Sequence, residues 1–395
     1  MKLYQTYQKY NLILFVCLLS QILAIVSFNV IVDPYVVFNS PKIVGFNKVK
    51  KETHSHARLF KAMEAIRVRP QTVFLGFSRT EFGLDPAHPA FRDRQPAYNL
   101  ALPGANMYEA RRYFDHAIYL NPDLNLVVIG VDFMMFTTFD EIKPDFKEER
   151  LETKNIVATD LLDVLFSLDA VFGSLKTIKA NILSPNDVGF YYPNGLREPE
   201  FFKKHIFGGI SNQGRFKKFL QEDLASLRKS MNNYQPIIST AYLNDLKKVV
   251  EICREKNIKI KLFISPVHVS LWESRRLLNV WPSFEEWKRE LVKIAPVWDF
   301  SGYNSITTEP IGQEDMKNYI DPSHYTKEVG DLILNRMFDV NQETVPQDFG
   351  VLVTDKNIEE HLKQIERQRA KWIQEDPEML KYVETFVPPE DWSQK

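Results

Sequence analysis

The sequence predicts an α/β protein whose core is a doubly wound, mostly parallel sheet with helices on both faces. Short apolar runs rich in β-branched residues, at 72–77, 97–102 and 124–132, are typical of strands that are buried on both faces. Segments with helical spacing alternate with such runs, as in sheets whose parallel strands are joined by crossover helices. A third observation is an uncharged N-terminal stretch that is long enough to cross a membrane.

That stretch, residues 11–32, follows Lys2 and Lys9, and Asp33 is the first charge after it. This charge asymmetry predicts a cytoplasmic tail at 1–10, a transmembrane signal anchor at 11–32, and a main domain outside the cytoplasm, either periplasmic or on the outer surface. A cleaved signal peptide is one alternative, although no small-x-small site follows the stretch. A buried core helix is the other alternative.

Composition limits the possible partners and cofactors. The 395 residues carry a formal net charge of −1, which argues against a nucleic-acid partner for the chain as a whole. The two cysteines, Cys17 in the apolar stretch and Cys253 in a predicted helix, predict neither a disulfide nor a cysteine-based metal site. We expect no metal and no other cofactor.

The remaining elements are predicted in chain order. A linker and helix occupy 33–69, with the linker extended over 33–51, and an α/β domain occupies 70–340. Within this domain we expect the three strands named above, a helix at 107–120, an insert at about 137–236, and then a helix at 239–256, a strand at 258–266, a helix at 284–295, a strand at 297–300 and a helix at 326–338. A charged C-terminal tail with one helix, at 357–374, completes the chain at 341–395.

Ser78 is the first candidate functional residue because it directly follows the first predicted strand. In open α/β sheets, ligands bind beyond the carboxyl ends of the strands, so a side chain at this position points into the binding crevice. A hydroxyl becomes an effective nucleophile when a neighbouring base removes its proton. The alternative is a serine that only caps a helix or forms a turn.

A candidate base lies in the sequence Asp321-Pro322-Ser323-His324, just before the last helix of the domain. His324 can accept the proton of a serine, and Asp321 can orient the imidazole and stabilise its charged form. The alternatives are a turn-forming Asp-Pro and a surface histidine. His268, at the end of the fourth predicted strand, is a rival base.

Acyl transfer also requires hydrogen-bond donors for an oxyanion. Gly104, after the second strand, can present its backbone N–H closely because it has no Cβ, and Asn106 can add a side-chain amide. The alternative is a simple strand-to-helix turn in which Asn106 caps the helix.

The order of these motifs resembles the SGNH/GDSL hydrolase superfamily. Gly76-Phe77-Ser78 follows the first strand, Gly104 the second and Gly130-Val131-Asp132 the third, and Asp-x-x-His precedes the last helix. The resemblance covers roughly 70–135 and 240–340. The Leu-Gly-x-Ser-Arg start and the single anchor look most like the membrane-anchored envelope branch, which includes the D-alanyl transfer protein and exopolysaccharide O-acetyltransferases. It implies Ser78 as nucleophile, His324 as base, Asp321 as its partner, and the N–H groups of Ser78 and Gly104 as oxyanion donors.

The third motif departs from the family pattern, which has Gly-x-Asn where this chain has Asp132. An ionised carboxylate in the oxyanion hole would repel the oxyanion. Asp132 is therefore either protonated or turned away to hold a neighbour such as Arg79, or Asn106 supplies the missing donor. The last two explanations are compatible. Arg79 has a second interpretation, because it could also bind an anionic donor or acceptor.

The resemblance implies an extracytoplasmic serine-dependent O-acyltransferase, O-acetyl in type, acting on a cell-envelope or exported polysaccharide. A polytopic membrane acyltransferase would then be the acyl donor. One alternative is an acyl esterase on the same substrate class, and another is a non-catalytic SGNH-like scaffold in a glycan assembly complex. Tyr191, Tyr192 and Asn194, in an aromatic loop of the insert, are candidate glycan contacts, although aromatic residues in loops also serve local packing.

Overall fold

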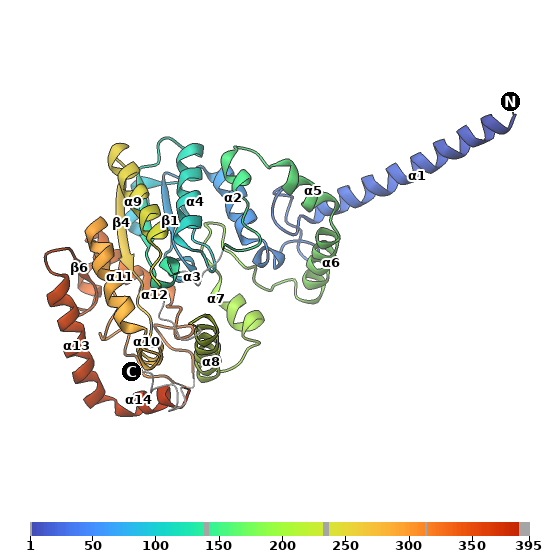
Figure 1. Cartoon of the computed structure of the whole chain (residues 1–395). Helices are drawn as coiled ribbons and strands as arrows, with labels where there is room; N and C mark the ends of the chain where they lie inside the picture. The colour runs from blue at the N-terminus through green and yellow to red at the C-terminus, as the bar shows by residue number, and fades with distance from the viewer. Residues whose placement is uncertain (1, 138–141, 232–236, 313, 387–395) are drawn as a thin grey trace. The chain divides into compact units, whose positions relative to one another are not determined.

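The computed structural model describes residues 2–137, 142–231, 237–312 and 314–386 (Figure 1). The chain divides into two compact units: unit 1 comprises Met1–Arg67 and Lys147–Phe190, and unit 2 comprises Val68–Phe146 and Tyr191–Lys395. Of the insert expected at about 137–236, residues 147–190 belong to unit 1, and the described residues on either side of them belong to unit 2. Parts of that insert, 138–141 and 232–236, and the end of the expected tail, 387–395, lie outside the described residues.

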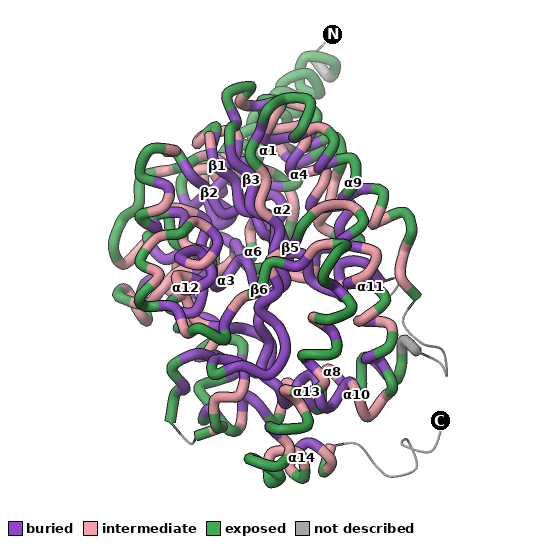
Figure 2. Tube along the Cα trace, turned by 90° about the vertical axis from the view of Figure 1, so that its left-hand side faces the viewer, coloured by how far each residue is buried: buried purple, intermediate pink, exposed green. Residues whose placement is uncertain are grey.

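Unit 2 is built on a six-stranded, mostly parallel sheet with the strand order β2-β1-β3-β4-β5-β6. The first five strands are parallel to their neighbours, and β6 pairs antiparallel with β5. All residues of β1 and β3 are buried, and Figure 2 shows these strands among the buried segments. The bounds are β1 (Thr72–Leu75), β2 (Ala97–Asn99), β3 (Leu126–Gly130), β4 (Lys259–Ile264), β5 (Val297–Asp299) and β6 (Val351–Val353).

The helices of unit 2 follow the predicted alternation, and α4 has the predicted bounds. The sequence analysis named no helix for α3, α7, α10 or α14. The bounds are α3 (Ser78–Gly83), α4 (Met107–Leu120), α7 (Pro199–Phe201), α8 (Asn212–Met231), α9 (Thr240–Glu255), α10 (Val269–Leu277), α11 (Trp281–Ile294), α12 (Lys327–Phe338), α13 (Ile358–Glu375) and α14 (Pro377–Glu384).

The described part of the expected charged tail belongs to unit 2, and the helix predicted at 357–374 is present as α13. Strand β6 completes the sheet, and Leu362, Ile365 and Trp372 on one face of α13 are buried. The polar residues on α13 also have partners, since the His361 ring bonds to Asp299 at 2.8 Å. A charged amphipathic helix therefore covers this part of unit 2, with its apolar face inward.

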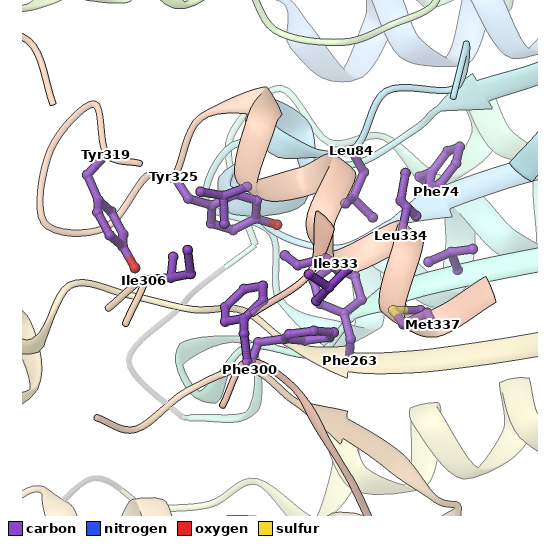
Figure 3. Close-up of a cluster of buried hydrophobic side chains, with 14 of the residues drawn as sticks. Phe74, Leu84, Phe263, Phe300, Ile306, Tyr319, Tyr325, Ile333, Leu334 and Met337 are labelled. Atoms are coloured by element: carbon purple, nitrogen blue, oxygen red, sulfur yellow. The ribbon is translucent and has the colours of Figure 1, made fainter. Parts of the chain in front are cut away.

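Helix α12 packs on the hydrophobic core of unit 2 next to α3. Ile333, Leu334 and Met337 of α12 belong to the same buried cluster as Phe74 and Phe263 of the sheet (Figure 3).

The contact between α12 and α3 depends on two glycines. A Cβ on Gly330 would lie 1.7 Å from the carbonyl oxygen of Gly83, and a Cβ on Gly83 would lie 1.9 Å from the Tyr325 ring. Larger residues would force α3 and α12 apart. The first residue of α3 and the loop before α12 are thereby held close together.

Unit 1 consists of helices and turns. Its elements are α1 (Lys2–Val32), η1 (Glu52–His54), α2 (Ala57–Val68, of which the last residue falls in unit 2), η4 (Glu148–Glu152), α5 (Ala158–Phe166) and α6 (Leu168–Leu183). Helix α1 begins at Lys2, so the stretch expected as a separate tail at 1–10 continues the helix. Residues Tyr4–Val32 are apolar enough to span a membrane.

The expected extended linker at 33–51 is wrong, because this segment forms turns. The Asp33 carboxylate accepts the backbone N–H groups of Val37, Phe38 and Ser40, which bends the chain directly after α1. Tyr35 is buried in the core of unit 1. Asn181 of α6 fixes the far end of the segment through hydrogen bonds of 2.9 Å to the backbone of Val49.

Candidate active site

Three residues that the sequence analysis selected meet at the carboxyl end of β1. Ser78 Oγ lies 2.8 Å from His324 Nε2, and His324 Nδ1 lies 2.7 Å from Asp321 Oδ2. Ser78 and His324 are each 6% exposed, and Asp321 is fully buried. These distances are those of a serine–histidine–aspartate triad, in which nucleophile, base and orienting carboxylate form one hydrogen-bonded chain.

A sharp turn after β1 places Ser78 at the start of α3. Gly76 has a φ of +142°, and a Cβ there would lie 2.6 Å from Thr80 Oγ1 and 2.7 Å from the carbonyl oxygen of Gly130. Gly130 is equally constrained, since its Cβ would lie 2.0 Å from the same Thr80 oxygen. As the first residue of α3, Ser78 has a backbone N–H that cannot find a partner within the helix.

Asp321 shapes the loop at residues 321–324, which we call the histidine loop. It also orients the His324 ring. Its Oδ1 accepts the backbone N–H groups of Ser323 at 2.8 Å and His324 at 3.0 Å, while its Oδ2 faces His324 Nδ1. Because an ionised carboxylate can only accept hydrogen bonds, Nδ1 carries the ring proton. The Nε2 of a neutral His324 is then left to accept the proton of the Ser78 hydroxyl.

A buried ion pair lies behind the triad. Arg79 Nη1 lies 2.9 Å from Asp132 Oδ1, and Arg79 Nε donates to Ser323 Oγ at 3.0 Å. The second oxygen of Asp132 accepts a hydrogen bond from Ser265 at 3.2 Å. The expected ion pair between Arg79 and Asp132 is therefore confirmed. It ties the histidine loop to the chain just beyond β3 and β4.

The loop after β2 lies beside the turn that carries Ser78, because Leu102 N–H donates to the carbonyl oxygen of Gly76 at 3.1 Å. Gly104 in this loop has a φ of +61°. The side chain of Asn106 is engaged elsewhere: its Oδ1 accepts Glu109 N–H at the start of α4, and its Nδ2 donates to the Tyr242 hydroxyl. The oxyanion role expected of Asn106 is thus replaced by helix capping, the alternative that the sequence left open.

His268 is not a rival base. Its ring is fully buried and bonds to Ser270 Oγ at 2.8 Å and to the backbone oxygen of Glu309 at 2.7 Å. Burial lowers the pKa of His268 to about 4, although the carbonyl of Glu309 partly opposes the shift. Its backbone N–H donates to the carbonyl oxygen of Pro322 at 3.0 Å, so His268 supports the histidine loop without reaching Ser78.

The His324 ring is surrounded by aromatic side chains that the sequence analysis did not select. Its centroid lies 4.8 Å from Phe82, 5.4 Å from Phe202 and 6.0 Å from Phe219. Phe82 could have been found, because it lies one helical turn after Ser78 on α3. Phe202 and Phe219 carry no sequence signal that links them to a histidine more than a hundred residues away.

A cavity of about 720 Å³ adjoins this aromatic cluster and shares Phe82 with it. Two of the three candidate glycan contacts, Tyr192 and Asn194, line the cavity. The third, Tyr191, does not line it, because its hydroxyl donates to Glu81 at 2.5 Å. Four basic residues also line the cavity: Arg197, Lys203, Lys317 and Lys327.

Within the described ranges, no group of three or more histidine, cysteine, aspartate or glutamate residues could hold a metal ion. Comparison with known proteins adds no identification. No protein-family model and no curated protein matches this chain.

Proposed function

We propose that this protein is an SGNH-type serine acyl-transfer enzyme that is anchored to a membrane and acts on a polysaccharide outside the cytoplasm. The observation that carries the proposal is the hydrogen-bonded chain Ser78–His324–Asp321, with its distances of 2.8 and 2.7 Å. A base within hydrogen-bond reach of a serine, itself oriented by a carboxylate, is the arrangement that makes a hydroxyl nucleophilic.

The position of the triad in the sheet supports the same proposal. The order 2-1-3-4-5 of the parallel strands is that of one common class of doubly wound sheets, in which ligands bind at the carboxyl ends of the strands. The turns after β1, β2 and β3 carry Ser78, Gly104 and Asp132, in the order of the SGNH motifs.

The proposed reaction has two halves. In the first, His324 Nε2 takes the Ser78 proton while Oγ attacks the acyl carbonyl, and the N–H groups of Ser78 and Gly104 stabilise the resulting oxyanion. Collapse of the intermediate breaks the bond to the donor's leaving group, which takes the proton from His324. In the second half, an acceptor hydroxyl gives its proton to His324 and attacks the acyl-serine; the bond between Oγ and the acyl carbon then breaks, and Ser78 takes the proton back from His324.

Water can replace the acceptor hydroxyl in the second half, and the same residues then act as an acyl esterase. For the transferase, which we favour, the acyl group is acetyl and a polytopic membrane acyltransferase supplies it. Both expectations come from the resemblance to the envelope branch.

The ion pair between Arg79 and Asp132 has a cost for catalysis. Asp132 occupies the position where the resembled family has an amide donor, and its carboxylate is committed to Arg79 and Ser265. Losing one oxyanion donor typically lowers turnover about 100- to 1000-fold. We therefore propose a slow enzyme whose oxyanion hole depends on backbone donors.

The cavity beside the aromatic cluster is the proposed polysaccharide subsite. Tyr192 is 39% exposed and can stack on a sugar ring, and Asn194, held by Asp85 at 2.8 Å, offers a side-chain amide to sugar hydroxyls. Phe82 of the aromatic cluster forms part of its wall, together with Ile320, which packs in the same buried hydrophobic cluster as Phe82.

Labelling with a serine-directed fluorophosphonate tests the proposal. The full chain, purified in lipid nanodiscs, should be labelled in a time-dependent manner at Ser78, and Ser78→Ala and His324→Ala should abolish the labelling. His268→Gln is the matched control and should be labelled like the wild type. If the folded wild type is not labelled, the non-catalytic scaffold becomes the better hypothesis, because Asp132 would then have ended the chemistry.

A further inference from the structure

The last two turns of α1 are packed within unit 1. Asn29 Nδ2 donates to the carbonyl oxygen of Leu165 at 3.0 Å, and Asn29 Oδ1 accepts a hydrogen bond from Ser174 at 2.8 Å. Leu165 belongs to α5 and Ser174 to α6, and Figure 1 shows both helices beside the C-terminal end of α1. Two helices of unit 1 are therefore fixed to the end of a helix that is apolar enough to span a membrane.

The length of α1 indicates how deep in the membrane the helices α5 and α6 lie. Crossing a hydrocarbon core requires about 20 apolar residues, and the apolar stretch begins at residue 11, after Lys9 and Tyr10. Twenty residues from there end near Val30, one residue beyond Asn29. Helices that pack against Asn29 thus lie at the edge of the hydrocarbon and not well above it.

The outward face of α5 and α6 is apolar and exposed. Leu168, the first residue of α6, is 75% exposed, and the exposed large apolar residues that follow recur at helical spacing. The complete set in these two helices is Leu162, Phe166, Leu168, Phe172, Leu175, Ile182 and Leu183, with exposures between 48% and 75%. We call these seven residues the α5–α6 face.

Helix α6 has the opposite pattern to a helix of a water-soluble domain. Its buried side consists of small or polar residues, namely Ala170, Gly173, Ser174, Thr177 and Asn181. Large apolar residues outside and small residues at the helix contacts are typical of helices packed within a bilayer.

A second segment at the end of α1 also exposes apolar side chains. Asn47 Nδ2 donates to the carbonyl oxygen of Ile31 at 3.0 Å, which fixes the loop before Lys48 against the helix end. The same loop exposes Ile43 and Val44, which are 53% and 60% exposed. Apolar side chains therefore project from two segments that are bonded to the same end of α1.

The two acidic residues beside the α5–α6 face, Asp163 and Asp169, are 66% and 67% exposed, and each has a polar partner. Asp163 bonds to Lys147 at 2.8 Å, and Asp169 accepts a hydrogen bond from the Tyr35 hydroxyl at 2.6 Å. Lys176 and Lys179 are exposed on α6, and long lysine side chains reach from an apolar surface to lipid phosphates.

We propose that the α5–α6 face, together with Ile43 and Val44, is embedded in the lipid leaflet at the C-terminal end of α1. The occupant of this face is the bilayer itself, because the face is continuous with the spanning helix. The inference goes beyond the acyl-transfer proposal and depends only on α1 spanning the membrane. Unit 1 is then held in the membrane interface by α1 and by this face.

Depth-resolved fluorescence quenching tests this proposal in the full chain. Leu175→Cys, in a Cys17→Ser, Cys253→Ala background, is labelled with an environment-sensitive fluorophore and reconstituted in nanodiscs. Lipids with a doxyl group high on the acyl chain should lower its emission by about half or more, since interfacial faces lie ~5–10 Å into the headgroup–acyl boundary. Aqueous iodide should have little effect.

Lys176→Cys is the matched variant, because it is the next residue of α6 and its side chain is 67% exposed. Its label should be quenched less by doxyl lipid and more by iodide than the label at Leu175. Ile182→Cys carries the same prediction as Leu175→Cys and replaces it if that variant misfolds.

Two results would overturn the proposal. Free quenching of the Leu175 label by iodide would mean that the face lies in water. Protection from both quenchers would mean that protein covers it, either a second copy of the chain or another partner. Neither result would affect the labelling of Ser78 by a fluorophosphonate, so the two proposals fail independently.

Discussion

Unit 2 contains two serine–histidine pairs with the same separation and different surroundings. Ser78 and His324 are bonded at 2.8 Å, and so are Ser270 and His268. The second ring atom of His324 meets a carboxylate, whereas that of His268 meets a backbone carbonyl. His324 adjoins an aromatic cluster that borders a cavity, whereas His268 is fully buried.

A short serine–histidine distance is not sufficient to activate a serine. A base must also hold a positive charge when it has taken the proton, and only a neighbouring carboxylate stabilises that charge strongly. Burial works in the opposite direction at His268, where it lowers the pKa to about 4. The serine of that pair has a base that resists protonation at neutral pH.

The largest expected effect comes from removing the carboxylate of Asp321, which is present at the first pair and absent from the second. Asp321→Asn should lower the rate of acyl transfer or fluorophosphonate labelling by about 10⁴-fold, because the amide favours the wrong tautomer of His324. The measurement is the labelling rate constant of the full chain at pH 7.5. A variant that is labelled within about tenfold of the wild type would show that Asp321 does not orient the base.

The next largest expected effect is a loss of stability when the buried ion pair behind the triad is broken. Arg79→Met leaves the buried Asp132 carboxylate without its partner, and losing one member of a buried pair lowers the free energy of unfolding by about 3–5 kcal/mol. Urea unfolding followed by tryptophan fluorescence measures this loss, since the five tryptophans among the described residues belong to unit 2.

Arg367→Met is the control for the arginine variant, because the pair of Arg367 with Glu360 is about 60% exposed on both sides. An exposed pair contributes at most about 1 kcal/mol. Equal losses in the two variants would contradict the role given to the Arg79–Asp132 pair.

A third prediction uses the depressed pKa of His268. Its ordinary value is 6.5 and its value in the folded protein is about 4, so between these pH values the unfolded chain binds the proton that the folded chain excludes. The stabilisation is therefore present above pH 6.5 and is lost as the pH falls toward 4. The loss should amount to about 3 kcal/mol.

His268→Gln isolates this contribution. Urea midpoints at pH 7.5 and pH 4.5 should show a smaller drop for the variant than for the wild type, because glutamine does not titrate. Equal drops of the urea midpoint in both proteins would show that folding does not lower the pKa of His268.

The sequence located the three triad residues of unit 2 better than the contacts that support them. Ser78 and the loop at Asp321 follow or precede strong local patterns, an apolar strand and an amphipathic helix, and both patterns formed as predicted. His268 also met a local criterion, because it lies at the end of a predicted strand. Its ring contacts distinguish it in the structure: a local one with Ser270 and a tertiary one with the backbone of Glu309.

The elements that sequence reasoning missed lack a periodic signal of their own. Strand β6 has three residues, two of them exposed, and it exists because β5 offers an open edge. Unit 1 brings together segments more than 100 residues apart, through contacts such as Asn181 with Val49. No local pattern in either segment indicates that partner.

The smallest expected effect completes the comparison of the two pairs. Ser270→Ala removes the hydroxyl partner of His268 and should lower the free energy of unfolding by about 1 kcal/mol, the contribution of one hydrogen bond. The labelling of Ser78 should keep its wild-type rate, because the backbone N–H of His268 still supports Pro322. If Ser270→Ala slowed labelling as strongly as Asp321→Asn, the histidine loop would depend on the orientation of the His268 ring. The two pairs would then form one network, and the distinction between catalytic and structural histidines would have to be abandoned.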